Sequence, residues 1–404
     1  MSAFTDSLAL LRTRRFGTYW VASLLSNIGT WTQQVAEPWL LVSIGAPPFL
    51  VGLDSFVMAA PAWLLTPIGG VLADLGDRRR VITVYQSIQM LCPITLVGLV
   101  LTDLVQPWIV IVLSFIVGVT DAISMPSFQT IVPTILRRDQ IAAGLALSST
   151  QYNLSRIVGP VLAGILIASL GAVACFAANA LSYVPFILVA LWILPRGRST
   201  EGRAGFDKDH PLAGYRKIAR RPDLRDAIAT VLITSALCSP LITFTPVLVK
   251  NAFNGSTTAF SSAIASFGLG ALVGAVALLA VDSRRDRRVI SSFAALVCGT
   301  TMAAAALAPS LWTLPAVLAA TGLTMNLSNI SANTFLQSAA PAHLRGQTVS
   351  LFMMAMRGGT AIGSLATGMT VEFFGVREAL LINAMLALIA QAALGRTWRR
   401  TRLD

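Results

Sequence analysis

Apolar stretches long enough to cross a bilayer recur along the whole chain, separated by short polar segments or by proline and glycine. A helix needs about 20 mostly apolar residues to span the hydrocarbon core. Twelve stretches meet this requirement, so we expect an all-α membrane protein with twelve transmembrane helices. The predicted spans are residues 17–43, 48–73, 81–102, 107–135, 141–169, 172–194, 224–249, 258–281, 289–308, 312–338, 348–371 and 376–395.

The positive charges alternate from loop to loop. Of the 30 Lys and Arg residues, all but four lie in the N-terminal segment, in loops that follow even-numbered spans, or in the C-terminal tail. Lys250 and Arg377 lie in the opposite loops, and Arg156 and Arg357 lie inside spans. Because short loops rich in Lys and Arg stay in the cytoplasm, we expect both chain ends there and an even number of spans.

A polar, basic linker at residues 195–223 separates residues 1–194 from residues 224–404, with six predicted spans on each side. Within it, LAGYRKIARRPDL is a short basic amphipathic stretch that we expect to lie against the lipid headgroups. Arg156 and Arg357 are 201 positions apart, and each precedes a glycine-rich stretch. Parallel repeats of six spans are a known plan of transporters. We therefore predict two pseudo-symmetric six-helix bundles.

The composition excludes a soluble globule, because 55% of the residues are hydrophobic and only 12% are charged, against about 25% charged in soluble domains. The net charge of +12 does not indicate nucleic-acid binding, since the basic residues gather in loops. No C-x-x-C pair is present, the cysteines lie within apolar stretches and the histidines in hydrophilic loops, so we predict neither a metal nor a cofactor. These residues are Cys92, Cys175, Cys238, Cys298, His210 and His343.

The segment GGVLADLGDRRRVI, at the end of the second span, has a glycine, three residues, an aspartate and then a basic cluster. It resembles the loop signature of the major facilitator superfamily. Four more segments, NIGTWTQQVAEPWLLV, MPSFQTIVP, NLSRIVGPVLAG and HLRGQTVSL, are similar to the branch that includes the enterobactin exporter and macrolide efflux proteins. Leu75 and Asp77 depart from the family pattern, where a basic residue and a glycine are common. The resemblance covers nearly the whole chain and implies the major facilitator fold in a bacterial cytoplasmic (inner) membrane.

The same resemblance implies a conformational latch at this loop. Asp74 would face the N-terminal end of span eleven, and the basic residues Arg78 and Arg79 would help to lock the two halves when the outside is open. A carboxylate is favourable beside a helix N-terminus, which carries partial positive charge, and Gly70 would permit close helix contact. The alternative is that the basic cluster serves only as a topology signal.

GPVLAG, at residues 159–164, is similar to the glycine-proline signature of antiporters in this superfamily, although Ala146 and Ser155 replace its earlier glycines. A Gly-Pro pair bends a helix and lets a neighbouring helix approach closely. Such a contact suits a rocking interface, and ordinary packing of small residues is the alternative.

Ionisable residues at membrane depth are costly and usually functional. Asp121 and Arg156 lie midway along spans four and five, whereas Glu37 and Asp54 lie toward the outer third of theirs, from which they could also reach the headgroups. We predict that Asp121 carries the coupling proton with Arg156 as its neighbour, and that Glu37 is a further proton-coupling residue. The alternative is a fixed ion pair between Asp121 and Arg156.

Polar residues form stripes on spans one and ten. Residues spaced by three or four positions share one helix face, and in the family these spans line a central cavity, so we predict that the stripes and Arg357 contact substrate. Hydrogen bonding between helices is the alternative. The stripes are Asn27, Trp31 and Gln34 in span one, and Asn326, Asn329 and Asn333 in span ten.

These features predict a secondary transporter that works by alternating access and exports a drug-like solute or a siderophore, driven by protons. The sequence has no G-x-x-x-x-G-K-[ST] segment for ATP and no grouping typical of an enzyme. The expected partners are a small-molecule substrate, protons and membrane lipids, with the protein a monomer. Alternatives are uptake of an organic solute, lipid or lysolipid transport, and, in a different class, a channel or a receptor without coupled turnover.

Overall fold

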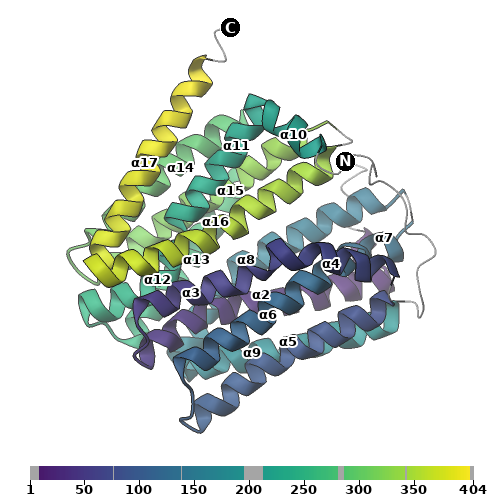
Figure 1. The fold of residues 1–404 in the computed structure, drawn as a ribbon, viewed down its shortest axis with the longest axis horizontal. Helices are drawn as coiled ribbons and strands as arrows, with labels where there is room; N and C mark the ends of the chain where they lie inside the picture. The colour runs from purple at the N-terminus through teal and green to yellow at the C-terminus, as the bar shows by residue number, and fades with distance from the viewer. Residues whose placement is uncertain are drawn as a thin grey trace. The chain divides into compact units, whose positions relative to one another are not determined.

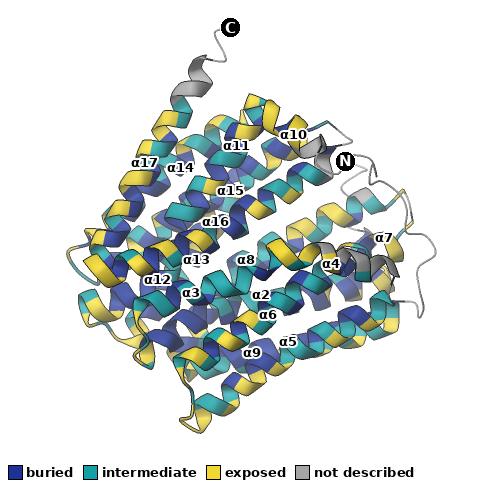
Figure 2. Cartoon of the chain, viewed as in Figure 1, coloured by how far each residue is buried: buried dark blue, intermediate teal, exposed yellow. Residues whose placement is uncertain are grey.

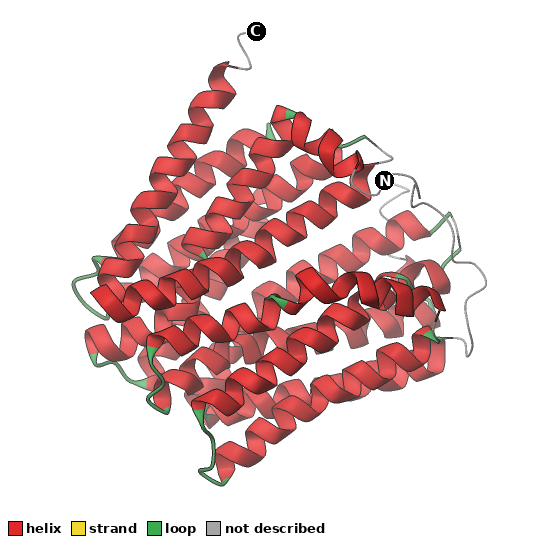
Figure 3. Ribbon diagram, viewed as in Figure 1, coloured by secondary structure: helices red, strands yellow, loops and turns green. Residues whose placement is uncertain are grey.

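The computed structural model describes residues 9–75, 77–137, 139–194, 213–280, 286–341 and 344–400, and these residues are almost entirely helical, with no strand among them (Figure 3). They form two compact units. The first unit contains the described residues of Met1–Ile44 and Val57–Ala204, and the second contains those of Gly45–Phe56 and Gly205–Asp404.

In the first unit, α2 packs on α8 and α9, α4 packs on α6, and α5 packs on α6 and α9 (Figure 1). The helices begin where the sequence places turn residues: Pro107 is the first residue of α6, and Gly171, with φ of 82°, separates α8 from α9. The helices are α2 (Arg14–Ser43), α4 (Pro61–Leu75), α5 (Arg78–Leu101), α6 (Pro107–Gln129), α7 (Ile131–Ile135), α8 (Ile141–Leu170) and α9 (Ala172–Ile193).

In the second unit, α13 and α14 pack on α15, α17 packs on α14, and α16 packs on α11. Two π-helical segments, η1 and η2, interrupt the chain between α11 and α13. The elements are α3 (Pro48–Ala59, whose last three residues belong to the first unit), α10 (Ala213–Arg220), α11 (Pro222–Ile233), η1 (Thr234–Cys238), α12 (Pro240–Val247), η2 (Leu248–Ala252), α13 (Thr257–Ala280), α14 (Arg287–Ala306), α15 (Leu314–Ala339), α16 (Arg345–Phe374) and α17 (Val376–Arg400).

Ten stretches of helix within the described residues are long and apolar enough to cross a membrane, which confirms an integral membrane protein. Several match the predicted spans closely, such as Pro107–Ile135 and Ala172–Ile193. The helices α2 and α15 are long enough but are not among the ten, because polar side chains interrupt them. These two helices carry the polar stripes of spans one and ten, so the count of twelve spans stays a prediction.

Large apolar side chains are widely exposed on the helices (Figure 2), for example Leu64 at 79% and Phe373 at 82%. Soluble monomers rarely expose contiguous apolar surface on this scale, whereas lipid covers it in a membrane protein. The four cysteines are buried and free, as expected for small core residues.

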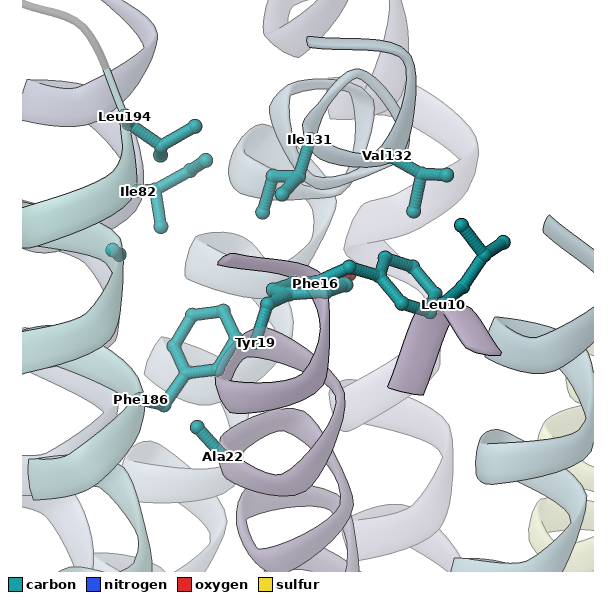
Figure 4. Packing of buried hydrophobic residues seen from close by; sticks show 10 residues of the cluster. Leu10, Phe16, Tyr19, Ala22, Ile82, Ile131, Val132, Phe186 and Leu194 are labelled. Atoms are coloured by element: carbon teal, nitrogen blue, oxygen red, sulfur yellow. The ribbon is translucent and has the colours of Figure 1, made fainter. Parts of the chain in front are cut away.

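Aromatic residues pack together at the end of the first unit where α2 begins and α9 ends (Figure 4). Tyr19 of α2 lies between Phe16 and Phe186, with ring centroids 6.3 Å apart in both pairs. Ile82 of α5 and Leu194, which follows α9, belong to the same buried cluster. This cluster fixes α2 against its neighbours and so positions the polar residues further along α2.

Both units place glycines where helices cross closely. A Cβ on Gly69 of α4 or on Gly118 of α6 would overlap backbone atoms of the helix it faces, and the same holds for Gly274 of α13 and Gly322 of α15. Small residues allow helix backbones to approach in membranes. The equivalent placement in the two units supports a duplicated origin.

Each unit also caps a helix with an aspartate from its basic loop. The side chain of Asp77 accepts a hydrogen bond from the Arg80 amide at the start of α5, and that of Asp286 accepts one from the Arg288 amide at the start of α14. A capping carboxylate satisfies an otherwise unpaired helical N–H. Asp77, which departs from the loop pattern noted in the sequence, thus caps α5.

Candidate functional site

Glu37 lies inside the first unit, with its side chain 4% exposed. Its Oε1 accepts a hydrogen bond of 2.7 Å from Nε2 of Gln33, one turn earlier on α2. The Oε1 atom of Gln33 in turn accepts a bond of 2.6 Å from Nδ2 of Asn179 on α9. The carboxylate is therefore enclosed by protein, and a chain of two amides hydrogen-bonds to it.

A small pocket with a volume of about 20 Å³, enough for a single water molecule, borders this carboxylate within the first unit. Eight of its ten lining residues have polar side chains, and they come from α2, α5, α6 and α9. A polar pocket between helices is a setting in which buried water is expected. The lining residues are Thr30, Gln33, Gln34, Glu37, Met58, Gln89, Ser114, Val117, Asn179 and Tyr183.

Further buried polar groups border the pocket. Gln86 donates a bond of 2.5 Å from Nε2 to Oε1 of Gln89, and both side chains are buried. The Oγ atom of Ser114 is buried and has no hydrogen-bond partner among the described residues. Because buried hydroxyls are almost always hydrogen-bonded, this hydroxyl is available to hydrogen-bond a water molecule in the pocket.

Arg156 lies on α8, which runs parallel to α2 in a constant register. Hydrogen bonds between the two helices join residues 127 or 128 positions apart, including Trp20 to Leu147 and Thr32 to Gly159. In this register Arg156 stands about eight residues, or roughly 12 Å along the axis, from the level of Glu37. Arg156 therefore belongs to a different level of the first unit.

Asp121 is half-buried midway along the segment Pro107–Ile135. It lies one turn beyond the pocket-lining Val117 and close enough to Tyr183 for an electrostatic interaction. The main packing partners of α6 are α4 and α5, whereas those of α8 are α2 and α9. Asp121 and Arg156 thus lie on two helices, α6 and α8, that have different principal packing partners.

The three residues of the span-one stripe have three different surroundings. Asn27 donates to the Ser23 carbonyl of its own helix at 2.9 Å. The Trp31 ring meets Tyr152 of α8 edge-on, with centroids 6.1 Å apart, and Gln34 lines the pocket. A Cβ on Gly159 would overlap Trp31, which shows that the Gly-Pro pair does bring α8 close to α2.

The three residues of the span-ten stripe also have three different surroundings. Asn326 donates from Nδ2 to the Ala271 carbonyl of α13 at 2.7 Å, which links two helices of the second unit. Asn329 is 3% exposed, and its Oδ1 has no hydrogen-bond partner among the described residues. Asn333 is half-buried and accepts a bond from Gln337. Arg357 is half-buried on α16.

The predicted latch falls largely outside the described residues. Gly70 and Asp74 lie on α4, but their side-chain environment is outside the described part of the structure, as is residue 76. Arg78 and Arg79 are half-buried at the start of α5.

Gln33 and Asn179 are not among the residues predicted from the sequence. A signal for the first was present, because Gln33 and Glu37 are four positions apart and so share a helix face. Asn179 is a strongly polar side chain in an otherwise apolar span, which is costly unless it has a partner. No sequence pattern predicts that these two residues contact each other, because they lie 146 positions apart.

Residues 5–402 match the model of a protein family described as transmembrane secretion effector. The staphyloferrin A transporter of Staphylococcus aureus is 23% identical over 89% of this chain and 90% of its own length, and the multidrug efflux pump Tap of Mycolicibacterium fortuitum is 23% identical over 91% and 92%. The enterobactin exporter EntS of Shigella boydii is 24% identical over 90% of this chain and 86% of its own length.

Among solved structures, the crystal structure of the nucleoside transporter NupG aligns with a TM-score of 0.73 at 14% sequence identity. The alignment covers 96% of this chain and 99% of that chain. At this identity the likeness concerns the fold alone.

Proposed function

Because the chain belongs to the transmembrane secretion effector family of the major facilitator superfamily, we propose that it is a proton-coupled exporter of a drug-like organic solute or a siderophore. The family resemblance seen in the sequence is confirmed, and the protein is a membrane transporter rather than an enzyme. Relatives named as an enterobactin exporter and a multidrug efflux pump support the direction of transport, and these two and the staphyloferrin A transporter support the class of substrate.

The proposed architecture has twelve spans in two six-helix bundles, residues 1–194 and 224–404, joined by the linker 195–223. It would lie in a bacterial inner membrane as a monomer with both ends in the cytoplasm. The ten apolar helical segments support this plan, with α2 and α15 as the two remaining spans. Polar side chains within a span are tolerated where they face protein or a water-filled cavity.

The buried carboxylate of Glu37 is the observation that carries proton coupling. A carboxylate within a membrane span is costly, and such residues usually serve a function such as proton transfer. Asp121 and Arg156 are further proton-coupling residues in this proposal. Transport would follow alternating access, in which the two halves rock about a site at the midplane.

The substrate would contact the polar face of spans one and ten, with Arg357 as a charged partner. The proposed contacts are Asn27, Trp31, Gln34, Asn326, Asn329 and Asn333. The latch of Gly70, Asp74, Arg78 and Arg79 would hold the outward-open state, as the family resemblance implies.

Membrane lipids are proposed partners of the linker helix α10. Ile218 is fully buried in the cluster that includes Leu224 and Leu336, so it holds α10 against the second unit, whereas Arg216, Lys217 and Arg220 are exposed. Exposed basic residues suit the surface of an anionic leaflet.

Transport can be tested with the purified protein in liposomes that contain a trapped pH indicator. Ethidium, Hoechst 33342 and a catecholate siderophore serve as probes, and a fluorescent lysophospholipid tests lipid transport. We expect saturable counterflow of at least one organic probe and its movement against a gradient when protons flow the opposite way. Passive flux without counterflow would indicate a channel, co-movement of probe and proton would indicate uptake, and movement of the lysophospholipid alone would indicate a lipid transporter.

A further inference from the structure

We propose that the pocket around Glu37 is the proton-binding site of this transporter, and that Gln33 and Asn179 are positioning residues that orient the Glu37 carboxylate. The inference rests on the proton-coupled transport proposed above and deepens it. The chemical step is the transfer of one proton between a water molecule in the pocket and the carboxylate.

The pocket has the composition that such a site requires. Glu37 is the only one of the ten described lining residues with a formal charge at neutral pH, and the others are mainly amides and hydroxyls. Amides and hydroxyls can hydrogen-bond to water and to either form of a carboxyl group. The pocket can therefore hold Glu37 both charged and neutral.

The two amides fix the direction in which hydrogen bonds run. Since Oε1 of Gln33 accepts from Asn179 at 2.6 Å, the amide nitrogen of Gln33 is the atom that points to Glu37, at 2.7 Å. A donated hydrogen bond stabilises the charged carboxylate. Asn179 acts on Glu37 only through Gln33, so its contribution is positional.

The close approach of α2 and α9 makes this arrangement possible. A Cβ on Gly29 of α2 would overlap the side chains of Ser182 and Asn179 of α9. The Ser182 hydroxyl donates to the Asn179 backbone carbonyl at 2.7 Å and also lies 3.3 Å from Oδ1 of Asn179. The oxygen of the Asn179 amide thus faces Ser182, and its nitrogen faces Gln33.

The unpartnered hydroxyl of Ser114 provides independent support for water in the pocket. Its side chain is 1% exposed, it comes from α6, and it lines the same space as Glu37. A water molecule at this point would satisfy Ser114 and supply the acceptor and donor through which the carboxyl exchanges its proton.

The titratable and charged neighbours of Glu37 come from four helices. Cys92 of α5 lies within electrostatic range of Glu37, Tyr183 of α9 lines the pocket, and Asp121 of α6 lies one turn beyond the lining. On α8, Arg156 and Tyr152 stand at a lower level of the shared register. The same register places the α8 backbone at Arg156 about eight residues from the level of Glu37.

The test compares four variants of the full-length protein in liposomes, with ethidium or Hoechst 33342 as the probe. Each variant is measured for counterflow without a proton gradient and for proton-driven movement at a series of pH values. The variants are Glu37→Gln, Asp121→Asn, Asn179→Ala and Asn383→Ala. Asn383 is the matched control, a buried amide of the second unit that donates to Thr367 at 2.7 Å.

We expect Glu37→Gln to retain counterflow and lose proton-driven movement, whereas Asp121→Asn, one turn beyond the pocket, should retain counterflow and weaken proton-driven movement without abolishing it. Asn179→Ala should move the midpoint of the pH profile upward by about half to one pH unit, because the charged carboxylate loses an oriented donor. Asn383→Ala should leave the midpoint unchanged. If Asn179→Ala fails to fold, Asn179→Ser replaces it, since a hydroxyl can still donate to Gln33, and a smaller upward shift is then expected.

Proton-driven movement by Glu37→Gln would overturn the assignment of the proton site. An unchanged midpoint in the Asn179 variant, or an equal shift in Asn383→Ala, would overturn the positioning role. Absence of proton-driven movement in the unmodified protein would instead overturn the proposed function. Infrared difference spectra between pH 5 and pH 8 give a second readout, in which a carboxylic C=O band should be present in the unmodified protein and absent in Glu37→Gln.

Discussion

Nη2 of Arg288, at the start of α14, lies 3.6 Å from Oδ2 of Asp226 on α11, and the Asp226 side chain is only 4% exposed. Arg225 donates two further bonds of 3.1 Å to Oδ1 of the same carboxylate. Two guanidinium groups therefore converge on one buried carboxylate and join two helices of the second unit.

Replacing Asp226 by Ala should lower the free energy of unfolding by about 2–4 kcal/mol, because it removes the acidic partner from a largely buried ion pair. Asp223→Ala is the matched control, since Asp223 pairs with Arg221 at 2.6 Å but the two side chains are 28% and 43% exposed. An exposed pair contributes at most about 1 kcal/mol. Denaturant unfolding in detergent measures both variants, and equal losses would contradict the role of burial.

Gly159→Ala should destabilise the first unit by about 1–3 kcal/mol, because the added methyl group would overlap Trp31 and force α8 away from α2. Gly98→Ala on α5 is the control, since nothing lies within 4 Å of the Cβ it would introduce. That change should stabilise the helix by about 0.5–1 kcal/mol. The close packing of Gly159 against Trp31 is contradicted if the thermal unfolding temperature shifts in the same direction for both variants.

Asn326 and Asn333 should behave differently although they lie on one face of α15. Asn326→Ala leaves the Ala271 carbonyl of α13 without its partner, so it should lower stability by about 1–2 kcal/mol. Asn333→Ala should leave stability within about 0.5 kcal/mol and weaken substrate binding if this residue lines the cavity. Unfolding curves and the KM for a transported probe separate the two effects. A changed KM in Asn326→Ala with unchanged stability would show that Asn326 contacts substrate and does not mainly link α15 to α13.

Single cysteines can test the orientation of the chain, because the four native cysteines are buried. Asp103 lies exposed between α5 and α6, and Lys217 lies exposed on α10. An impermeant maleimide added to intact cells should label Asp103→Cys from outside, and should label Lys217→Cys only after the membrane is opened. Labelling of both from the same side would exclude the proposed topology.

Much of the fold could be predicted because its signals are local. Span boundaries at Pro107 and near Gly171 follow from residues that start or end helices wherever they occur. The same local reasoning could not foresee the π-helical segment η1. On α11, one turn before η1 begins, the Thr230 carbonyl accepts a hydrogen bond from Gln391 of α17. These two residues are 161 positions apart, so only the folded unit brings them together.

The candidate site was predictable only in its parts. Glu37 stands out in any apolar span, but its pocket depends on Gln89, Ser114 and Asn179 from three other helices. Which polar residue meets which is decided by helix register, such as the constant offset between α2 and α8. A sequence stripe identifies a face, and packing then decides whether that face binds a neighbour or borders a pocket.

The polarity of α2 also has a consequence for biosynthesis. For a segment that carries amides and a carboxylate, the free energy of transfer into lipid alone is too small to keep it in the bilayer. The hydrogen-bonding partners of α2 lie on α8 and α9. Those helices leave the ribosome long after α2 does. We therefore expect the first helix to wait at the translocon until its later partners arrive.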